Sequence, residues 1–184
     1  MLRHGQIEGH EEKRFIGSRT DIPLDQVGKA QAQVWQKAFS EIRFDAVYAS
    51  ELKRCLDTAA IICPEQNIQI DHRLNEINMG TWDGKFFDEI RQALPLEFAR
   101  RGRQIDSFRP PRGESFQDLL ERVSPFFNGC IKKHHSSQQL SRILVVTHAG
   151  VIRVMACRLL KINLQQLFEI RMDYGHLFLI STLP

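Results

Sequence analysis

The chain has 184 residues and a mass of 21.3 kDa, and 42% of its residues are hydrophobic and 26% charged, values typical of one compact globular domain rather than a disordered chain. The longest apolar runs, 143–146 and 177–180, are far shorter than the roughly 20 residues that a membrane-spanning helix needs. A net charge of +3 is too small to indicate a nucleic-acid partner. We therefore expect a single domain over 1–184 that binds neither a membrane nor nucleic acid. Both apolar runs are expected to be buried strands.

The four cysteines form no C-x-x-C pair and lie mostly among apolar neighbours: Cys55, Cys63, Cys130 and Cys157. This placement is typical of reduced thiols in a core. The N-terminal sequence lacks the basic and then apolar segments of a secretion signal. Cytoplasm is the expected location.

Hydrophobic spacing predicts alternating helices and strands in the first half of the chain. The expected elements are a helix over 25–39, a strand over 46–49, a helix over 50–63, a strand over 68–70, an irregular loop over 74–85 and a helix over 86–98. Ser50 is a candidate N-cap for the second of these helices, and Pro64 ends it. Pro95 is expected to kink or shorten the third.

The second half begins with an Arg-rich segment that also holds Gly102, Gly113 and two consecutive prolines, so we expect an exposed basic loop over 100–112. Ser115 and Asp118 resemble a capping box at the start of a helix that runs toward Cys130. The remaining expected elements are a strand over 142–146, a helix over 151–160 and a strand over 177–181. Helices and strands that alternate in this way predict a three-layer αβα fold, with a mostly parallel central sheet and helices on both faces.

The first strand is short in this sequence. If a strand leads into Arg3 and His4, only Met1 and Leu2 remain to form it, whereas a central strand normally has several residues. Either the numbering begins inside a longer chain or the first strand is truncated, and both explanations stay open.

Residues suited to phosphate chemistry follow three of the predicted strands. Arg3 and His4 follow the first, Ser50 and Arg54 follow the second, and His148 follows the strand over 142–146. Open α/β sheets bind ligands beyond the carboxyl ends of their strands, so these side chains are expected to converge. Arginine is a multidentate phosphate ligand, and a neutral imidazole can attack phosphorus. The combination predicts a phosphoryl site that needs no metal and no cofactor.

The chain carries six ordered motifs: Leu2-Arg3-His4-Gly5; Arg14 to Gln31, with the pattern R-x-x-G, D-x-P-L, G and Q; Ser50 to Ala59, with S-x-L-x-R-x-x-x-T-A; Leu74 to Trp82, with L-x-E and G-x-W; Gly113-Glu114-Ser115; and Val145 to Gly150, with V-T-H-x-G. Together they resemble the histidine phosphatase superfamily, also called the phosphoglycerate mutase-like family. The resemblance covers nearly the whole chain and implies a phosphoglycerate mutase-like fold.

The resemblance also implies roles for individual residues. His4 would be the nucleophile that forms a phosphohistidine, and Arg3, Arg54 and His148 would hold the phosphoryl oxygens. Glu76 would give a proton to the leaving group and then take one from the hydrolytic water. The implied partner is a small phosphate monoester, and the oligomeric state stays open.

The sequence departs from the family pattern in two ways: Gln6 and Ile7 follow the Arg-His-Gly signature where members often have Glu and Ser or Thr, and the residue six positions beyond the nucleophile is His10. His10 stands where members often have an asparagine six residues beyond the nucleophile, so it either replaces that donor or is an ordinary exposed histidine. Arg14 keeps its spacing, and its contact is either the phosphate or a distal substrate group. Glu114 is interpreted as a turn residue and a helix N-terminal charge. For the basic loop over 100–112 we favour a solvated surface over a role in gathering an anionic substrate.

The loop over 74–84, the Gly113 turn and the tail over 158–175 look most like α-ribazole phosphatases. The chain lacks the insertions of cofactor-dependent phosphoglycerate mutases, which favours hydrolysis. We therefore expect a metal-independent phosphomonoester hydrolase, with α-ribazole 5′-phosphate as a candidate substrate. Mutase-type phosphotransfer and a catalytically silent module that binds phosphate esters are the alternatives.

Overall fold

A single parallel sheet forms the centre of the molecule in the computed structural model, which describes residues 1–134 and 141–181. The strands are β1 (Leu2–Arg3), β2 (Ala46–Ala49), β3 (Ile68–Ile70) and β4 (Ile143–Thr147), in the spatial order β1-β4-β2-β3. All three pairings are parallel. The predicted mostly parallel sheet is confirmed, and the first strand is two residues long.

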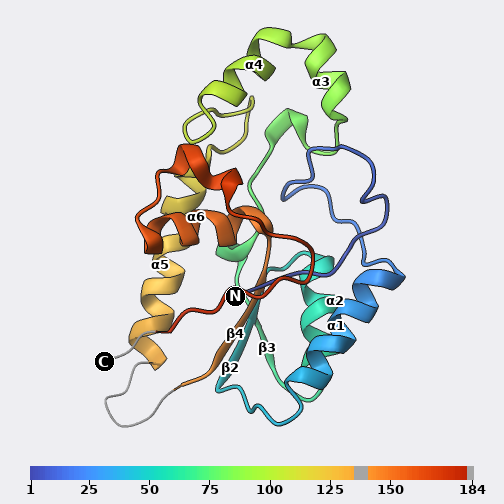
Figure 1. Ribbon diagram of the computed structural model, residues 1–184, viewed down its shortest axis with the longest axis vertical. Coiled ribbons are helices and arrows are strands. Elements are labelled where there is room, and N and C mark those ends of the chain that lie inside the picture. Colours follow the sequence, from blue (N-terminus) through green and yellow to red (C-terminus); the bar gives the residue numbers. More distant parts are fainter. Residues whose placement is uncertain (135–140, 182–184) are drawn as a thin grey trace.

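Alternate residues of the central strands divide the core between the two faces of the sheet. Val47 and Val146 belong to a cluster under helices α1 (Gln26–Ala38) and α2 (Lys53–Ile62). Tyr48 and Val145 belong to a larger cluster under α5 (Phe116–His134) and α6 (Ala149–Leu160). Figure 1 shows one helix pair on each side of the sheet. Because successive strand residues point to opposite faces, both helix layers can be packed from one sheet, and the predicted three-layer αβα fold is confirmed.

Two short helices lie at one end of the long axis of the molecule, α3 (Phe87–Ala93) and α4 (Pro95–Arg103) (Figure 1). The expected single helix over 86–98 is divided because Pro95 lacks an N–H and instead takes the first position of α4. The expected exposed loop over 100–112 is wrong in its first part, because Arg100, Arg101 and Arg103 form the last turn of α4. Cations at a helix C-terminus interact favourably with the helix dipole.

Short 3₁₀ turns complete the fold at His72–Leu74, Gly80–Trp82 and Leu164–Glu169. The predicted capping box is confirmed: Ser115 Oγ accepts from the Asp118 amide, and Asp118 Oδ2 accepts from the Ser115 amide. The expected strand over 177–181 is wrong. Leu177 forms one antiparallel bridge to Leu2, and Leu179 is 82% exposed, so this apolar run is not buried.

Three of the four cysteines are buried, and Cys130 is half-buried; all four carry free thiols. No helix within 1–134 and 141–181 is both long enough and apolar enough to cross a membrane. The assignment of 1–184 to one domain stays a prediction.

Candidate active site

Two histidines from opposite ends of the chain meet beyond the carboxyl ends of neighbouring strands. His4 follows β1 and His148 follows β4, and their ring centroids lie 5.2 Å apart. His4 is 4% exposed and His148 is fully buried. Parallel pairing of Arg3 with Thr147 brings the two strand ends into register, which explains why the rings meet.

The hydrogen bonds of His4 define its tautomer. Its Nδ1 lies 2.8 Å from the Gly5 carbonyl oxygen, which can only accept, so Nδ1 carries the proton. Nε2 therefore carries the lone pair. Burial, followed by the positive charges of Arg54 and Arg3, lowers the pKa of His4 well below its usual 6.5. A neutral imidazole with a free Nε2 is the form that can attack phosphorus.

His148 is held by partners at both ring nitrogens. The Ser50 hydroxyl donates to Asn75 Oδ1, so its oxygen is left to accept from His148 Nε2 at 2.8 Å. Arg54 Nε then donates to His148 Nδ1 over 3.3 Å. Burial and the charge of Arg54 lower the pKa of His148 well below 6.5. The Ser50 hydroxyl thus orients His148, and the prediction that Ser50 caps α2 is wrong because that helix begins after Leu52.

Arg54 is buried, and its guanidinium donates hydrogen bonds to other groups of the protein. Its Nη1 donates to the Thr20 carbonyl at 2.7 Å and its Nη2 to the Gly17 carbonyl at 3.1 Å. The side chain is 1% exposed. Two backbone carbonyls from a distant loop and the imidazole of His148 therefore fix its orientation.

Asp83 fastens the loop that holds Arg54. Its carboxylate accepts from the amides of Gly17 and Arg19 and from the hydroxyl of Thr20. The carbonyls of Gly17 and Thr20 are thereby turned toward Arg54. Asp83 is not in contact with the histidines, and its part in the site is to position this loop.

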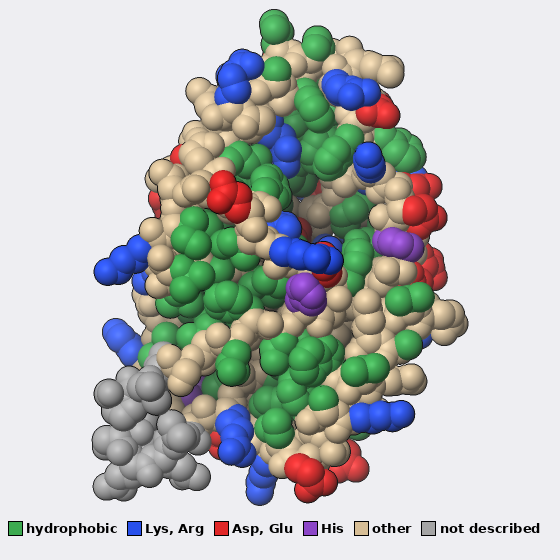
Figure 2. Space-filling model, in the orientation of Figure 1, with side chains coloured by type: hydrophobic (Ala, Val, Ile, Leu, Met, Phe, Trp, Pro, Cys, Tyr) green, Lys and Arg blue, Asp and Glu red, His purple; other side chains and the backbone are tan. Residues whose placement is uncertain are grey.

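A cavity of about 380 Å³ opens on the face shown in Figure 2, where Lys and Arg side chains border the hollow. Its lining includes Arg3, Glu76 and Tyr174, whereas His4, Arg54 and His148 are not part of the lining. The Tyr174 ring lies 3.8 Å over the Arg3 guanidinium and 5.5 Å from the His4 ring, between centroids. Tyr174 therefore covers the predicted nucleophile on the side of the cavity.

Glu76 presents a carboxyl group to the cavity and is held by two backbone amides. Oε1 accepts from the Ile77 amide at 2.9 Å, and Oε2 accepts from the Gly150 amide at 3.1 Å. A Cβ added to Gly150 would stand 2.2 Å from Oε1. Glycine at this position thus leaves the space that the carboxyl group occupies.

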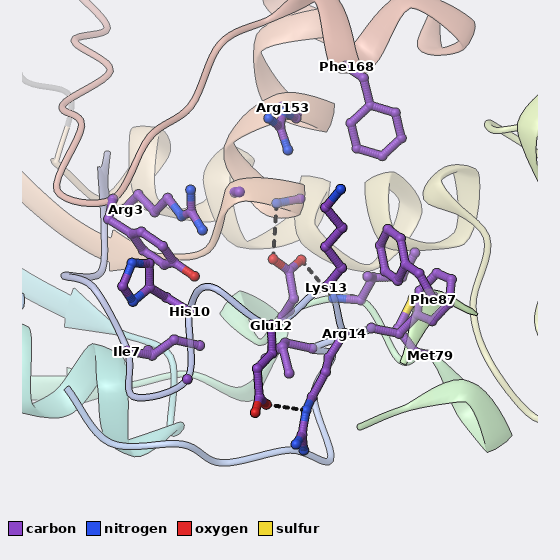
Figure 3. Close-up of a pocket in the computed structure, with 18 of the residues that line it drawn as sticks. Arg3, Ile7, His10, Glu12, Lys13, Arg14, Met79, Phe87, Arg153 and Phe168 are labelled. Carbon is purple, nitrogen blue, oxygen red and sulfur yellow. Dashed lines mark hydrogen bonds and ion pairs between the residues drawn. The ribbon is translucent and has the colours of Figure 1, made fainter. Parts of the chain in front are cut away.

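His10 and Arg14 both line the cavity, as Figure 3 shows. Nδ1 of His10 lies 3.1 Å from a Glu11 carboxylate oxygen, and its side chain is 39% exposed. Nε of Arg14 lies 2.6 Å from a Glu12 carboxylate oxygen, and its guanidinium lies over the Phe86 ring. Both side chains lie in the cavity wall, whereas His4, Arg54 and His148 are not part of that lining.

The cavity residues that were not predicted include Tyr174, Arg101 and Arg153. Arg101 was placed in the exposed basic loop, and Arg153 was taken as part of a helical pattern. Glu114 precedes α5 outside any helix or strand, and its carboxylate pairs with Arg122 and accepts from the Asn78 amide.

Comparison with known proteins assigns the chain to a family. The model of the histidine phosphatase superfamily (branch 1) matches residues 1–182. The chain belongs to this superfamily. The predicted family and the predicted enzyme class, a phosphatase, are thus confirmed.

Relatives within the superfamily differ in the activity for which they are named. Phosphoserine phosphatase 1 of Hydrogenobacter thermophilus is 29% identical over 94% of this chain and 81% of its own length. A 2,3-bisphosphoglycerate-dependent phosphoglycerate mutase of Bartonella tribocorum is 31% identical over 95% of this chain and 87% of its own. The structure of the α-ribazole phosphatase from Shigella flexneri superimposes with a TM-score of 0.84 at 26% identity, covering 95% of this chain and 85% of that one.

Proposed function

We propose that the protein hydrolyses phosphate monoesters through a phosphohistidine on His4. The observation that carries this proposal is the state of the His4 ring: Nδ1 donates to the Gly5 carbonyl, so Nε2 is unprotonated beside the cations of Arg3 and Arg54. An unprotonated nitrogen among fixed positive charges suits attack on an anionic phosphoryl group.

In the first step, His4 Nε2 forms a bond to phosphorus while the bond from phosphorus to the ester oxygen breaks. Glu76, in its protonated form, gives its proton to the departing oxygen. In the second step, the Glu76 carboxylate takes a proton from water, and the resulting hydroxide attacks phosphorus as the N–P bond breaks. Inorganic phosphate leaves, and both residues regain their starting states.

We assign the phosphoryl oxygens to Arg3, Arg54 and His148. Within 1–134 and 141–181, Arg3 Nε is buried and has no hydrogen-bond partner, which makes it a donor available to an oxyanion. The Arg54 to His148 hydrogen bond, at 3.3 Å, is longer than the bonds from Arg54 to the loop carbonyls. Breaking this bond would free Arg54 Nε to donate to a phosphoryl oxygen, and His148 Nδ1, which accepts in this bond, would donate to a phosphoryl oxygen once it carries a proton. His10 and Arg14, in the cavity wall, would contact the rest of the ester.

The test is hydrolysis of 4-nitrophenyl phosphate by the full chain in the presence of a chelator. We expect turnover and an acid-labile, base-stable phosphoprotein after rapid quenching. His4→Ala should abolish both, whereas His72→Ala, a change at an exposed histidine, should leave both intact. Circular dichroism reports whether each variant is folded. Full activity of folded His4→Ala would overturn the assignment of the nucleophile.

The acceptor of the phosphoryl group separates hydrolysis from the alternatives. Release of inorganic phosphate in step with the alcohol indicates hydrolysis, whereas transfer to added phosphoglycerate indicates a mutase. Binding of esters with neither product indicates a silent binding module. α-Ribazole 5′-phosphate belongs on the substrate panel because of the motif resemblance and the similarity to the Shigella flexneri enzyme.

A further inference from the structure

The cavity carries more positive charge than a single phosphoryl group requires. Its lining contains the cationic side chains Arg3, Lys13, Arg14, Arg101 and Arg153, against the two carboxylates of Glu12 and Glu76. Arg14 is paired with Glu12, and Arg3 belongs to the proposed phosphoryl site. Three cations remain, Lys13, Arg101 and Arg153, against the single remaining carboxylate of Glu76.

Arg101 is a half-buried cation that has no counter-ion among the described residues. Within the described part of the chain, its guanidinium makes no ion pair and no side-chain hydrogen bond, and it lies 5.2 Å from the Phe15 ring centroid and 5.8 Å from that of Phe168. Burial lowers the pKa of Arg101. Such a group is costly to desolvate and gains most from an anion brought in by a ligand.

Arg153 lies against the same aromatic ring as Arg101. Its guanidinium carbon is 5.2 Å from the Phe168 centroid, and among residues 1–134 and 141–181 its side chain has one hydrogen-bond partner, the Ile170 carbonyl, which accepts from Nε at 3.0 Å. Figure 3 shows Arg153 and Lys13 projecting into the cavity near Phe168. The Nη donors of Arg153 thus stay available, on a different element from Arg101.

We propose that Arg101 and Arg153, supported by Phe168, form a second anion subsite, and that the substrate is a phosphate monoester whose organic part carries a carboxylate or a second phosphoryl group. This inference rests on the proposed function. Guanidinium groups bind both oxyanions through paired N–H donors. Phe15 and Phe168 supply apolar lining to the same cavity. α-Ribazole 5′-phosphate has no second anion, so the subsite disfavours it as the natural substrate.

The test compares two isosteric esters that differ in charge, 4-carboxyphenyl phosphate and 4-carbamoylphenyl phosphate. We expect the wild-type kcat/KM to be about tenfold or more higher for the carboxylate, the gain typical of a charge-assisted contact. Arg101→Gln should bring the ratio of the two values close to one. Arg103→Gln, at an exposed position of the same helix, should preserve it. A third ester, hydroquinone bisphosphate, decides between carboxylate and phosphate.

Each outcome has a separate meaning. A wild-type ratio near one, an unchanged ratio in Arg101→Gln, or an equal fall in Arg103→Gln would overturn the subsite while leaving phosphatase activity established. Failure of the wild type to hydrolyse either ester would instead count against the proposed function. Arg153→Gln provides a second variant, and we expect the same loss of preference from it.

Discussion

The Tyr174 ring lies over the Arg3 guanidinium at 3.8 Å, in a segment that is fastened to the residues around the proposed nucleophile. The Gly175 amide donates to the His4 carbonyl, and the Gly175 carbonyl accepts from the Trp35 indole. The Met172 carbonyl accepts from Arg3 Nη1. The tail of the chain thus fixes both the position of Arg3 and the cover over His4.

We expect Tyr174→Ala to lower kcat/KM for 4-nitrophenyl phosphate about tenfold, because Arg3 loses a cation–π contact of about 0.5–2 kcal/mol and becomes free to move. Tyr174→Phe keeps the ring and should stay within about threefold of the wild type. Steady-state kinetics on both variants check this. Equal losses would show that the hydroxyl, rather than the stacking ring, is what matters.

Glu76→Gln should affect poor leaving groups more than good ones. An alkyl phosphate needs a proton on its departing oxygen, so we expect a loss of about 100-fold or more in kcat/KM, the scale typical of general acid catalysis. 4-Nitrophenolate leaves without a proton, and the loss there should be less than about tenfold. Kinetics across a series of aryl and alkyl esters measure the difference. The same loss along the whole series would argue against a proton donor.

Gly150→Ala offers an independent approach to the same carboxyl group. The added methyl would occupy space 2.2 Å from Glu76 Oε1, so Glu76 must move although its chemistry is untouched. We expect the leaving-group dependence to resemble that of Glu76→Gln, in a protein that retains its circular dichroism spectrum. Wild-type kinetics in this variant would show that the carboxyl position is not important.

Stability should fall as the pH drops from about 6.5 to 5. His4 and His148 have folded-state pKa values well below their usual 6.5, so in this range the unfolded chain binds protons that the folded chain does not. The free energy of unfolding then rises with pH through the window. Carboxylates such as Asp71 and Asp118, whose pKa values are lowered from 3.8, titrate below it.

Urea denaturation at several pH values between 5 and 7.5 measures this dependence. His4→Gln should lose the linkage of about one proton relative to the wild type. His72→Gln, at an exposed histidine, provides the comparison. A pH dependence that is the same in all three proteins would show that the buried histidines are not its source.

Asp83→Ala should lower both stability and turnover although Asp83 is remote from the histidines. Removing its carboxylate leaves the amides of Gly17 and Arg19 without their acceptor, and Arg54 loses the fixed position of two carbonyl partners. We expect a loss of about 1–3 kcal/mol in the free energy of unfolding and a fall in kcat/KM. Asp83→Asn keeps an acceptor oxygen and should recover part of each. Unchanged kinetics in Asp83→Ala would show that Arg54 holds its position without the loop.

The sequence was sufficient for those parts of the fold and site where local pattern and long-range structure agree. The strand over 46–49 and the capping box at Ser115 are set by nearby residues. The proximity of His4 and His148 could be predicted because both follow parallel strands, whose ends lie at one edge of the sheet.

Other features depend on partners that no local pattern reveals. Ser50 has the features of an N-cap, but its hydroxyl is used by His148 and Asn75. The apolar run from Leu177 matched a strand, yet it finds one bridge to β1 and stays largely exposed. Arg101 was grouped with solvated arginines because a sequence does not tell which member of a charged helix turns toward a cavity.

The anchoring of Arg54 by the carbonyls of Gly17 and Thr20 gives one residue a structural part and, in the mechanism that we propose, a part in phosphoryl binding. Loss of activity after a change at this arginine would not by itself reveal which duty had failed. Surveys of variants in this protein therefore need soluble yield and specific activity measured side by side. A low yield indicates a folding defect, whereas a low specific activity of the soluble protein indicates a catalytic defect.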